Sequence, residues 1–187
     1  MVKQLAKAHV INQAGDSRFD LLKRWTYTMI HCYEAKEFIR LAEETHKVHL
    51  KSSLDEVLTQ QALFRGFLLS YAKCFGGNGS GKASLDPRGV FASGSSEMTT
   101  HNRIIELRNK FAAHNDDSGL DDVVIDIQES DKEIVYSHHY GLANPLNEYP
   151  EYKKNISAID AFIVNRLNQV ADRIQAETGK PLIMAGG

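Results

Sequence analysis

The sequence holds 187 residues, of which 42% are apolar and 25% are charged, as in an ordinary globular domain. This length suffices for one domain with a sizeable core and hardly for two, so we expect residues 1–187 to form a single domain. The formal net charge of -2 excludes a chain-wide basic field that would gather nucleic acid, and a count of two cysteines excludes a disulfide framework.

The amino-terminal residues MVKQLAKAHVINQAGDS lack the continuous apolar core of a signal peptide. No run approaches the ~20 apolar residues that a membrane-spanning helix needs. Cys32 and Cys74 both lie within helical patterns, which suits a reducing compartment. We therefore expect a cytoplasmic protein without a membrane segment.

Two long helices are predicted in the first part of the chain. The first runs from about Asp16 to about Lys47, because apolar residues recur there at helical spacing. Ser53 with Glu56 three residues later is a capping box, and it begins a second helix that ends at about Phe75.

Residues 76–95 are rich in glycine and serine and are predicted to be a flexible loop. Gly76, Gly81 and Lys82 have the spacing of a phosphate-binding loop, but Ala83 stands where a serine or threonine must hold magnesium. Such a loop also follows a buried parallel strand, and a helix precedes this one. A nucleotide-splitting phosphate loop is therefore not expected.

A third helix is predicted from Ser95 or Ser96 to near Asn115, and a last helix from about Glu151 to about Glu177. Between them, two runs of alternating apolar and polar residues predict a β-hairpin at about 121–141. The alternating positions are Val123, Ile125 and Ile127 in the first run and Ile134, Tyr136, His138 and Tyr140 in the second. A lone hairpin is marginally stable, so we expect it to pack on the helices.

The predicted fold is therefore mainly α, a four-helix bundle with a small β-hairpin inserted before the last helix. Within the third predicted helix, the string ELRNKFAAHND places Arg108 next to Asn109 and six residues before His114. A helical bundle with this R-x5-H motif near a helix end resembles the HEPN superfamily (higher eukaryotes and prokaryotes nucleotide-binding), and most closely its abortive-infection type. The motif covers about ten residues, and the order of helices covers about 150.

The resemblance implies a metal-independent ribonuclease, in which the RNA 2′-hydroxyl attacks the adjacent phosphate without any cofactor. His114 would then act as general base or acid, since its pKa lies near working pH. Arg108 would clamp the phosphate through its planar pair of donors, and Asn109 would orient the histidine or the phosphate. The resemblance further implies a toxin or phage-defence effector, with an antitoxin protein as a partner.

RNA and a second copy of the chain are the other partners expected. Lys73, Lys82, Arg88 and Lys110 are the further cations that we expect to contact RNA, two of them as a basic flap in the loop 76–95. In HEPN nucleases two motifs usually meet across a homodimer interface. Six residues of a straight helix separate Arg108 and His114 by about 120° around its axis, which gives a second helix room to contribute.

Alternative interpretations stay open. Arg108 could pair with Glu106, Asp116 or the second helix, and His114 continues the apolar stripe of its own helix. The chain would then be a non-catalytic HEPN-like module that binds a nucleotide, RNA or a protein, or a plain helical domain with a chance motif. Glu43, His46 and His49 have a spacing that could hold zinc, but the third position leaves the shared face, so no metal site is predicted. His101 is expected to be exposed.

Overall fold

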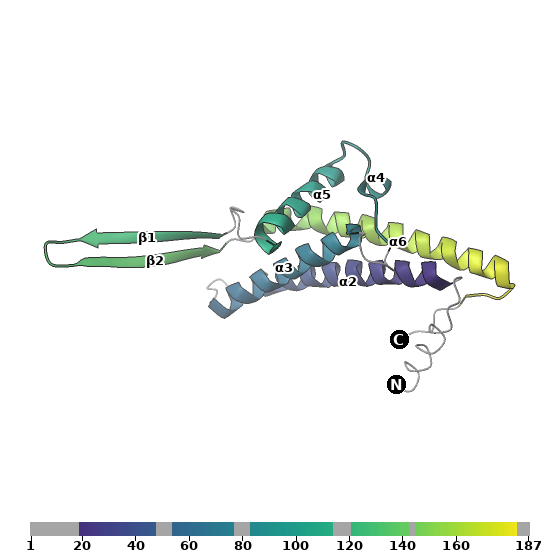
Figure 1. Cartoon of the computed structure of the whole chain (residues 1–187), viewed down its shortest axis with the longest axis horizontal. Helices are drawn as coiled ribbons and strands as arrows, with labels where there is room; N and C mark the ends of the chain where they lie inside the picture. Colours follow the sequence, from purple (N-terminus) through teal and green to yellow (C-terminus); the bar gives the residue numbers. More distant parts are fainter. Residues whose placement is uncertain (1–18, 48–53, 77–82, 114–120, 143–144, 183–187) are drawn as a thin grey trace, which may run out of the picture.

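The computed structural model describes residues 19–47, 54–76, 83–113, 121–142 and 145–182. Within these residues the chain is mainly helical, with five α-helices and one antiparallel hairpin that precedes the long final helix (Figure 1). The elements in chain order are α2 (Asp20–Lys47), α3 (Leu54–Phe75), α4 (Pro87–Val90), α5 (Ser96–Leu107), the π-helical turn η2 (Arg108–Ala113), β1 (Asp121–Glu129), β2 (Ile134–Leu142), the 3-10 turn η3 (Leu146–Glu148) and α6 (Tyr149–Thr178). None of the described helices is both long enough and apolar enough to cross a membrane.

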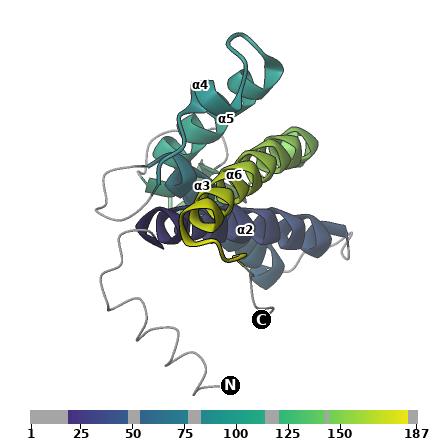
Figure 2. The ribbon, with the colours of Figure 1, turned by 90° about the vertical axis from the view of Figure 1, so that its right-hand side faces the viewer.

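Helices α2, α3 and α6 form the main body of the fold. α2 runs antiparallel to both of the others. Along α2, Glu34 and then Phe38 contact Ser70 and then Gly66 of α3, and Lys36 and then Glu43 contact Asp160 and then Lys153 of α6. α6 lies between α2 on one side and α5 on the other (Figure 2). The predicted boundaries at Phe75 and near residues 151 and 177 are confirmed to within two residues.

The core of the body is aromatic where α3 meets α6. Its largest fully buried side chains are Phe64, Phe67, Tyr71, Tyr149 and Tyr152. The rings stack across the helices, with centroids 5.5 Å apart for Phe67 and Tyr152 and 5.8 Å apart for Phe64 and Tyr149. Such rings bury large apolar areas, so this cluster is the main source of stability of the body.

Gly66 lets α2 and α3 approach closely. A Cβ at this position would meet the ring of Phe38 at 3.1 Å, which is tighter than ordinary van der Waals contact. A larger residue would therefore push the two helices apart or displace the ring.

The segment after α3 is more structured than the sequence predicts. Residues 77–82 lie outside the described residues, but α4 lies in the second half of the predicted flexible loop. Asp86 caps α4 by accepting from the backbone N–H of Arg88 (3.0 Å), and Pro87 takes the first helical position. Leu85 and Phe91 are buried in the core on either side of it, so this segment is part of the body.

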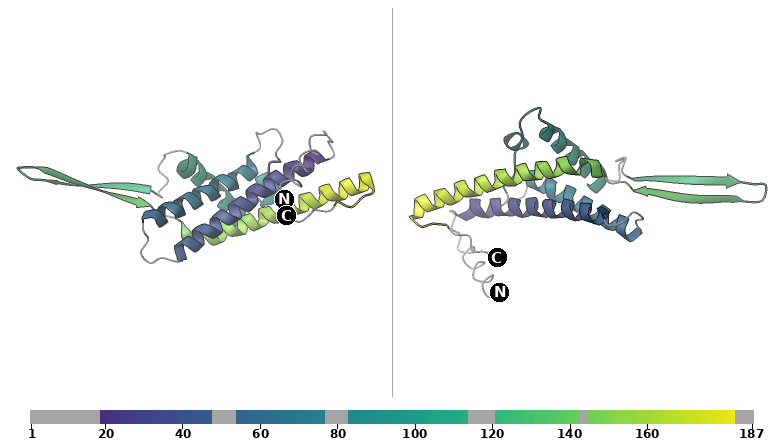
Figure 3. Two further views of the ribbon diagram at one scale, coloured as in Figure 1. Left: turned by 90° about the horizontal axis from the view of Figure 1, so that it is seen from below. Right: turned by 180° about the vertical axis from the view of Figure 1, so that it is seen from behind.

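The hairpin forms at the predicted residues, and its alternating positions pair with one another. It does not pack on the helices, so that expectation is wrong. Ile125 lies opposite His138, and Ile127 lies opposite Tyr136. The hairpin projects from one end of the body in every view (Figures 1 and 3). All residues from Val124 to His138 are exposed, Ile127 to 67% and Tyr136 to 71%. Alternation indicates that one face is apolar; it carries no information on what covers that face.

Candidate functional site

The Arg108 motif lies where α5 passes into η2. Ser95 caps the beginning of α5 by accepting from the N–H of Met98 (3.1 Å). Ile104 and Leu107, both fully buried, fix the helix against the core. The α-helix then ends at Leu107, and the predicted continuation to near Asn115 is a π-helical turn as far as Ala113. Such turns widen a helix locally and occur often at functional sites.

Arg108 has no acidic partner among the residues that the structure describes. Its Nη1 donates to Oδ1 of Asn109 (2.9 Å), and its buried Nε has no hydrogen-bond acceptor there. Glu106 is occupied elsewhere, by Lys110 at 2.9 Å and Arg103 at 3.6 Å. The alternative pair with Glu106 is therefore not formed, and the half-buried guanidinium has no anion beside it within the described ranges.

Asn109 is the neighbour that holds this guanidinium. Its amide oxygen accepts from Arg108, while its own side chain is exposed. A neutral acceptor orients an arginine without neutralising it, so the charge remains open to a phosphate. His114 and Asp116 lie outside the described residues.

The other expected cations are not gathered around Arg108. Lys110 is engaged by Glu106, whose pKa is lowered chiefly by that hydrogen bond. Lys73 lies beside Glu34 of α2, whose pKa it also helps to lower. Arg88 is exposed in α4, which lies at the beginning of α5 rather than at its end (Figure 1). Lys82 lies outside the described residues.

His101 lies in the middle of α5, seven residues before Arg108, and the expectation that it is exposed is wrong. It is 6% exposed and packs edge-on against Phe75, with ring centroids 4.4 Å apart. Its Nδ1 shares a hydrogen bond of 3.1 Å with the hydroxyl of Tyr71, which also accepts from Asn155 (3.4 Å). Burial lowers the pKa of His101. The neutral imidazole is thus part of a polar cluster that joins α3, α5 and α6.

A second polar cluster, between α2 and α3, was missed by the sequence analysis. Nδ1 of His31 donates to Glu34 (3.1 Å), and the hydroxyl of Ser70 donates to the same oxygen (3.2 Å). The pKa of Glu34 is lowered, first by the hydrogen bond from His31. The i, i+3 spacing of His31 and Glu34 could have revealed the pair. Because Ser70 binds the carboxylate and not the imidazole, the cluster is no nucleophilic triad.

A groove of about 560 Å³ lies at the end of the body away from the hairpin. Its floor is apolar, and two arginines of α6 lie on its rim. Six of its lining residues are Trp25, Leu85, Phe162, Val170, Arg166 and Arg173. Arg166 lies over the Phe162 ring at 5.0 Å, and Trp25 lies 6.3 Å from the same ring. These residues come from α2, the segment before α4 and α6, so no local pattern in the sequence marks the groove.

Metal and thiol chemistry find no support in the part of the chain that is described. No group of three or more histidine, cysteine, aspartate or glutamate side chains there could hold a metal ion. Of the three residues whose spacing could hold zinc, Glu43 binds Lys153 (2.8 Å), while the side chain of His46 and all of His49 lie outside the described part. Cys32 and Cys74 are buried, and burial raises the pKa of Cys32 to about 12.

Comparison of the chain with models of known protein families, with curated proteins and with solved structures finds no match. The phosphate-loop interpretation also finds no support in the fold, since the described strands form a single antiparallel hairpin and no parallel sheet. Gly76 donates its N–H to the carbonyl of Ala72 (2.9 Å) and ends α3. Any function must therefore be argued from the arrangement of the residues themselves.

Proposed function

We propose that the protein is a HEPN-type, metal-independent ribonuclease that works as a homodimer. The observation that carries the proposal is the state of Arg108: a guanidinium oriented by Asn109, without a carboxylate partner among the described residues, six residues before His114. A phosphate is a natural anion for such a site, since arginine presents two parallel donors to it.

In the proposed mechanism, His114 removes the proton of the RNA 2′-hydroxyl. The 2′-oxygen attacks the adjacent phosphorus, and Arg108 stabilises the negative charge that grows on the phosphoryl oxygens. The bond to the 5′-oxygen of the next nucleotide breaks, and that oxygen takes up a proton, from His114 or from its counterpart in a second copy. The products are a 2′,3′-cyclic phosphate and a free 5′-hydroxyl. A toxin or phage-defence role, held in check by an antitoxin protein, would fit this activity.

The second candidate function is a non-catalytic HEPN-like module that binds a nucleotide, RNA or a protein. The positions of the other expected cations, which are not gathered around Arg108, favour the binding module. Lys110 is engaged by Glu106, and Lys73 and Arg88 lie near other elements, so Arg108 lacks a surrounding basic groove among the described residues. RNA binding draws much of its affinity from several such contacts.

Cleavage of a mixed RNA pool in EDTA separates the two candidates. We expect cleavage by the wild type and loss of cleavage in Arg108→Ala and in His114→Ala. Arg40→Ala is the matched control, because it removes an exposed arginine of α2 that pairs with Glu37 and Glu44. A folded wild type that binds RNA without cleaving it would support the binding module, and equal cleavage by all variants would place the activity outside this motif.

A further inference from the structure

The hairpin is strongly acidic, which the small net charge of the chain conceals. The 22 residues from Asp121 to Leu142, here called the arm, hold six acidic side chains and one lysine, a formal charge of -5. The whole chain carries -2, so the residues outside the arm carry +3. The arm is therefore much more acidic than the rest of the chain, and a positively charged surface would complement it.

One face of the arm is also apolar and uncovered. Ile125, Ile127, Ile134 and Tyr136 lie on the same face, because Ile127 pairs with Tyr136 and residues two apart along a strand point the same way. Their exposed fractions run from 58% to 71%. A two-stranded hairpin that buries neither face is marginal in water, so a covering surface would stabilise it.

The groove at the other end of the body has the complementary chemistry. Its floor, with Trp25, Phe162 and Val170, is apolar, and Arg166 and Arg173 are on its rim. Arg173 pairs with Glu177 (2.8 Å), an exposed contact that another carboxylate can replace at little cost. Arg166 is bonded only to the neutral Gln169 (3.0 Å) among the hydrogen bonds of the described residues. Asp86 is the one acidic lining residue, and its carboxylate caps α4.

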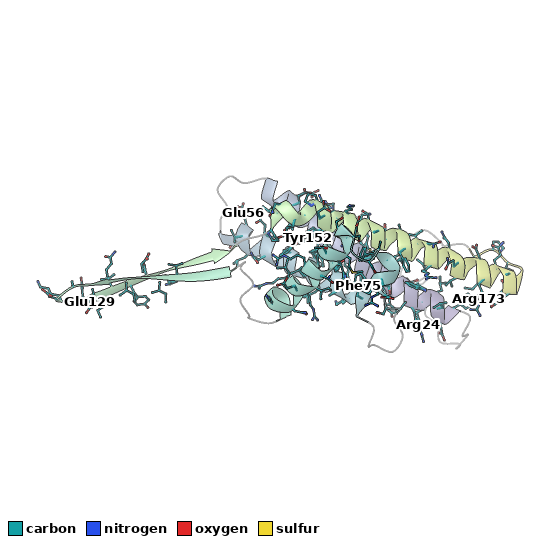
Figure 4. The ribbon with its side chains drawn as sticks, turned by 90° about the horizontal axis from the view of Figure 1, so that it is seen from above. Arg24, Glu56, Phe75, Glu129, Tyr152 and Arg173 are labelled. Carbon is teal, nitrogen blue, oxygen red and sulfur yellow. The ribbon has the colours of Figure 1, made fainter. Side chains whose placement is uncertain are left out.

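The arm cannot reach the groove of its own chain. Figure 4 shows Glu129 at the tip of the arm and Arg173, with Arg24 nearby, at the opposite end of the long axis. We propose that the arm of one copy docks in the groove of a second copy, and that the two copies do so reciprocally. When the two copies lie antiparallel, the arm of each copy lies beside the end of the other copy that carries the groove. Both arms and both grooves are then occupied, so the assembly closes after two chains.

The size of the contact suits a stable pair. Nine-residue strands are about 30 Å long, and two of them present a face about 10 Å wide. Two such contacts, with both surfaces counted, bury on the order of 1,200 Å², at the lower end of specific interfaces. A single arm–groove contact would bury half of that and would fall in the range of weak encounters.

The test measures the association of the full chain by sedimentation equilibrium. We expect the wild type to be a dimer at micromolar concentration. The arm variant Ile127→Ser with Tyr136→Ser and the groove variant Arg166→Glu with Arg173→Glu should each raise the dissociation constant at least tenfold. Leu58→Ser, at an apolar side chain of α3 that is 50% exposed, and Arg40→Glu are the controls and should leave it unchanged. The arm side chains from Val124 to His138 are all exposed, and circular dichroism checks that each variant is folded.

Mixing the two variants identifies the contact. The arm variant keeps an intact groove and the groove variant keeps an intact arm, so the mixture should regain one contact and associate more tightly than either alone. A monomeric wild type would overturn the proposal. So would a groove variant that still dimerises, because arms that pair with each other do not need the groove. None of these changes touches Arg108 or His114, so RNA cleavage by the same variants is a separate measurement of the proposed nuclease.

Discussion

His101 and Arg108 lie seven residues apart in the α5–η2 segment, and their surroundings differ sharply. His101 is buried, its Nδ1 is bonded to Tyr71, and three aromatic rings surround it. Arg108 has one neutral acceptor, Asn109, and a buried Nε without any among the described residues. A polar side chain whose bonds are complete stabilises the fold, whereas an unpaired guanidinium lowers stability unless a ligand completes it. The comparison therefore indicates a structural role for His101, and it is the basis of the ligand-binding role that we propose for Arg108.

The largest expected effect is at Arg108. Arg108→Ala should lower the rate of RNA cleavage about 10²–10³-fold, because a donor to the phosphoryl oxygens is lost. Arg108→Lys keeps the positive charge but not the planar pair of donors, so its cleavage rate should lie between those of the wild type and Arg108→Ala. The melting temperature should change little, since no described carboxylate loses a partner. A variant that unfolds instead would show that Arg108 belongs with His101 as a structural residue.

Asn155 tests the structural role of the buried polar cluster around His101. Its Nδ2 donates to the backbone carbonyl of Glu97 (2.9 Å) and to the Tyr71 hydroxyl (3.4 Å), and its side chain is 1% exposed. Asn155→Ala should lower the free energy of unfolding by about 1–3 kcal/mol, because both buried partners lose a donor. Urea denaturation measures the change. Ser157→Ala, two residues further along α6 and exposed, is the control and should change it by less than about 0.5 kcal/mol.

His101 should make the stability depend on pH. Burial lowers its pKa below the value of about 6.5 that it has in the unfolded chain, so the unfolded state binds the proton first. The contribution of His101 to stability is complete above this unfolded pKa and is lost as the pH falls toward the folded pKa. The slope can reach about 1.4 kcal/mol per pH unit in that window. Urea denaturation between pH 7 and pH 5 measures it, and His101→Gln should flatten the curve; an unchanged curve would contradict the assignment.

The smallest effect is expected at the cap of α5. Ser95→Ala removes the acceptor of the Met98 N–H and should cost about 1 kcal/mol. Ser96→Ala, at the next and exposed position, should cost less. If Ser95→Ala also reduced the rate of RNA cleavage, in proportion to the loss of folding stability, the helix cap at Ser95 and the site at Arg108 would be coupled.

Much of the fold could be predicted because its patterns are local. The apolar stripes of α3 and α6 follow the helical period, and the alternation in β1 and β2 gives the hairpin its register. α4 could also have been predicted, because Asp86 followed by Pro87 is a helix start. The surrounding glycines made the segment resemble a loop.

The rest depends on contacts between distant segments. His101 is buried because Phe75 and Phe91 cover it, and the groove needs Trp25 and Phe162, which lie 137 positions apart in sequence. That Glu106 binds Lys110 and Arg103 rather than Arg108 could not be foreseen either, since all four residues lie close together in the sequence. At the candidate site the sequence indicates which residues to examine, and the packing decides which of their charges stay open.

The most direct test of the account uses two versions of one RNA with the wild-type protein in EDTA. The first is all-ribose, and the second carries a single 2′-deoxy nucleotide at the main cleavage position. The account predicts that the first is cut to a 2′,3′-cyclic phosphate and a 5′-hydroxyl, and that the deoxy position is not cut. Cleavage of both versions, or products with a 3′-hydroxyl, would contradict attack by the 2′-hydroxyl and with it the role given to Arg108.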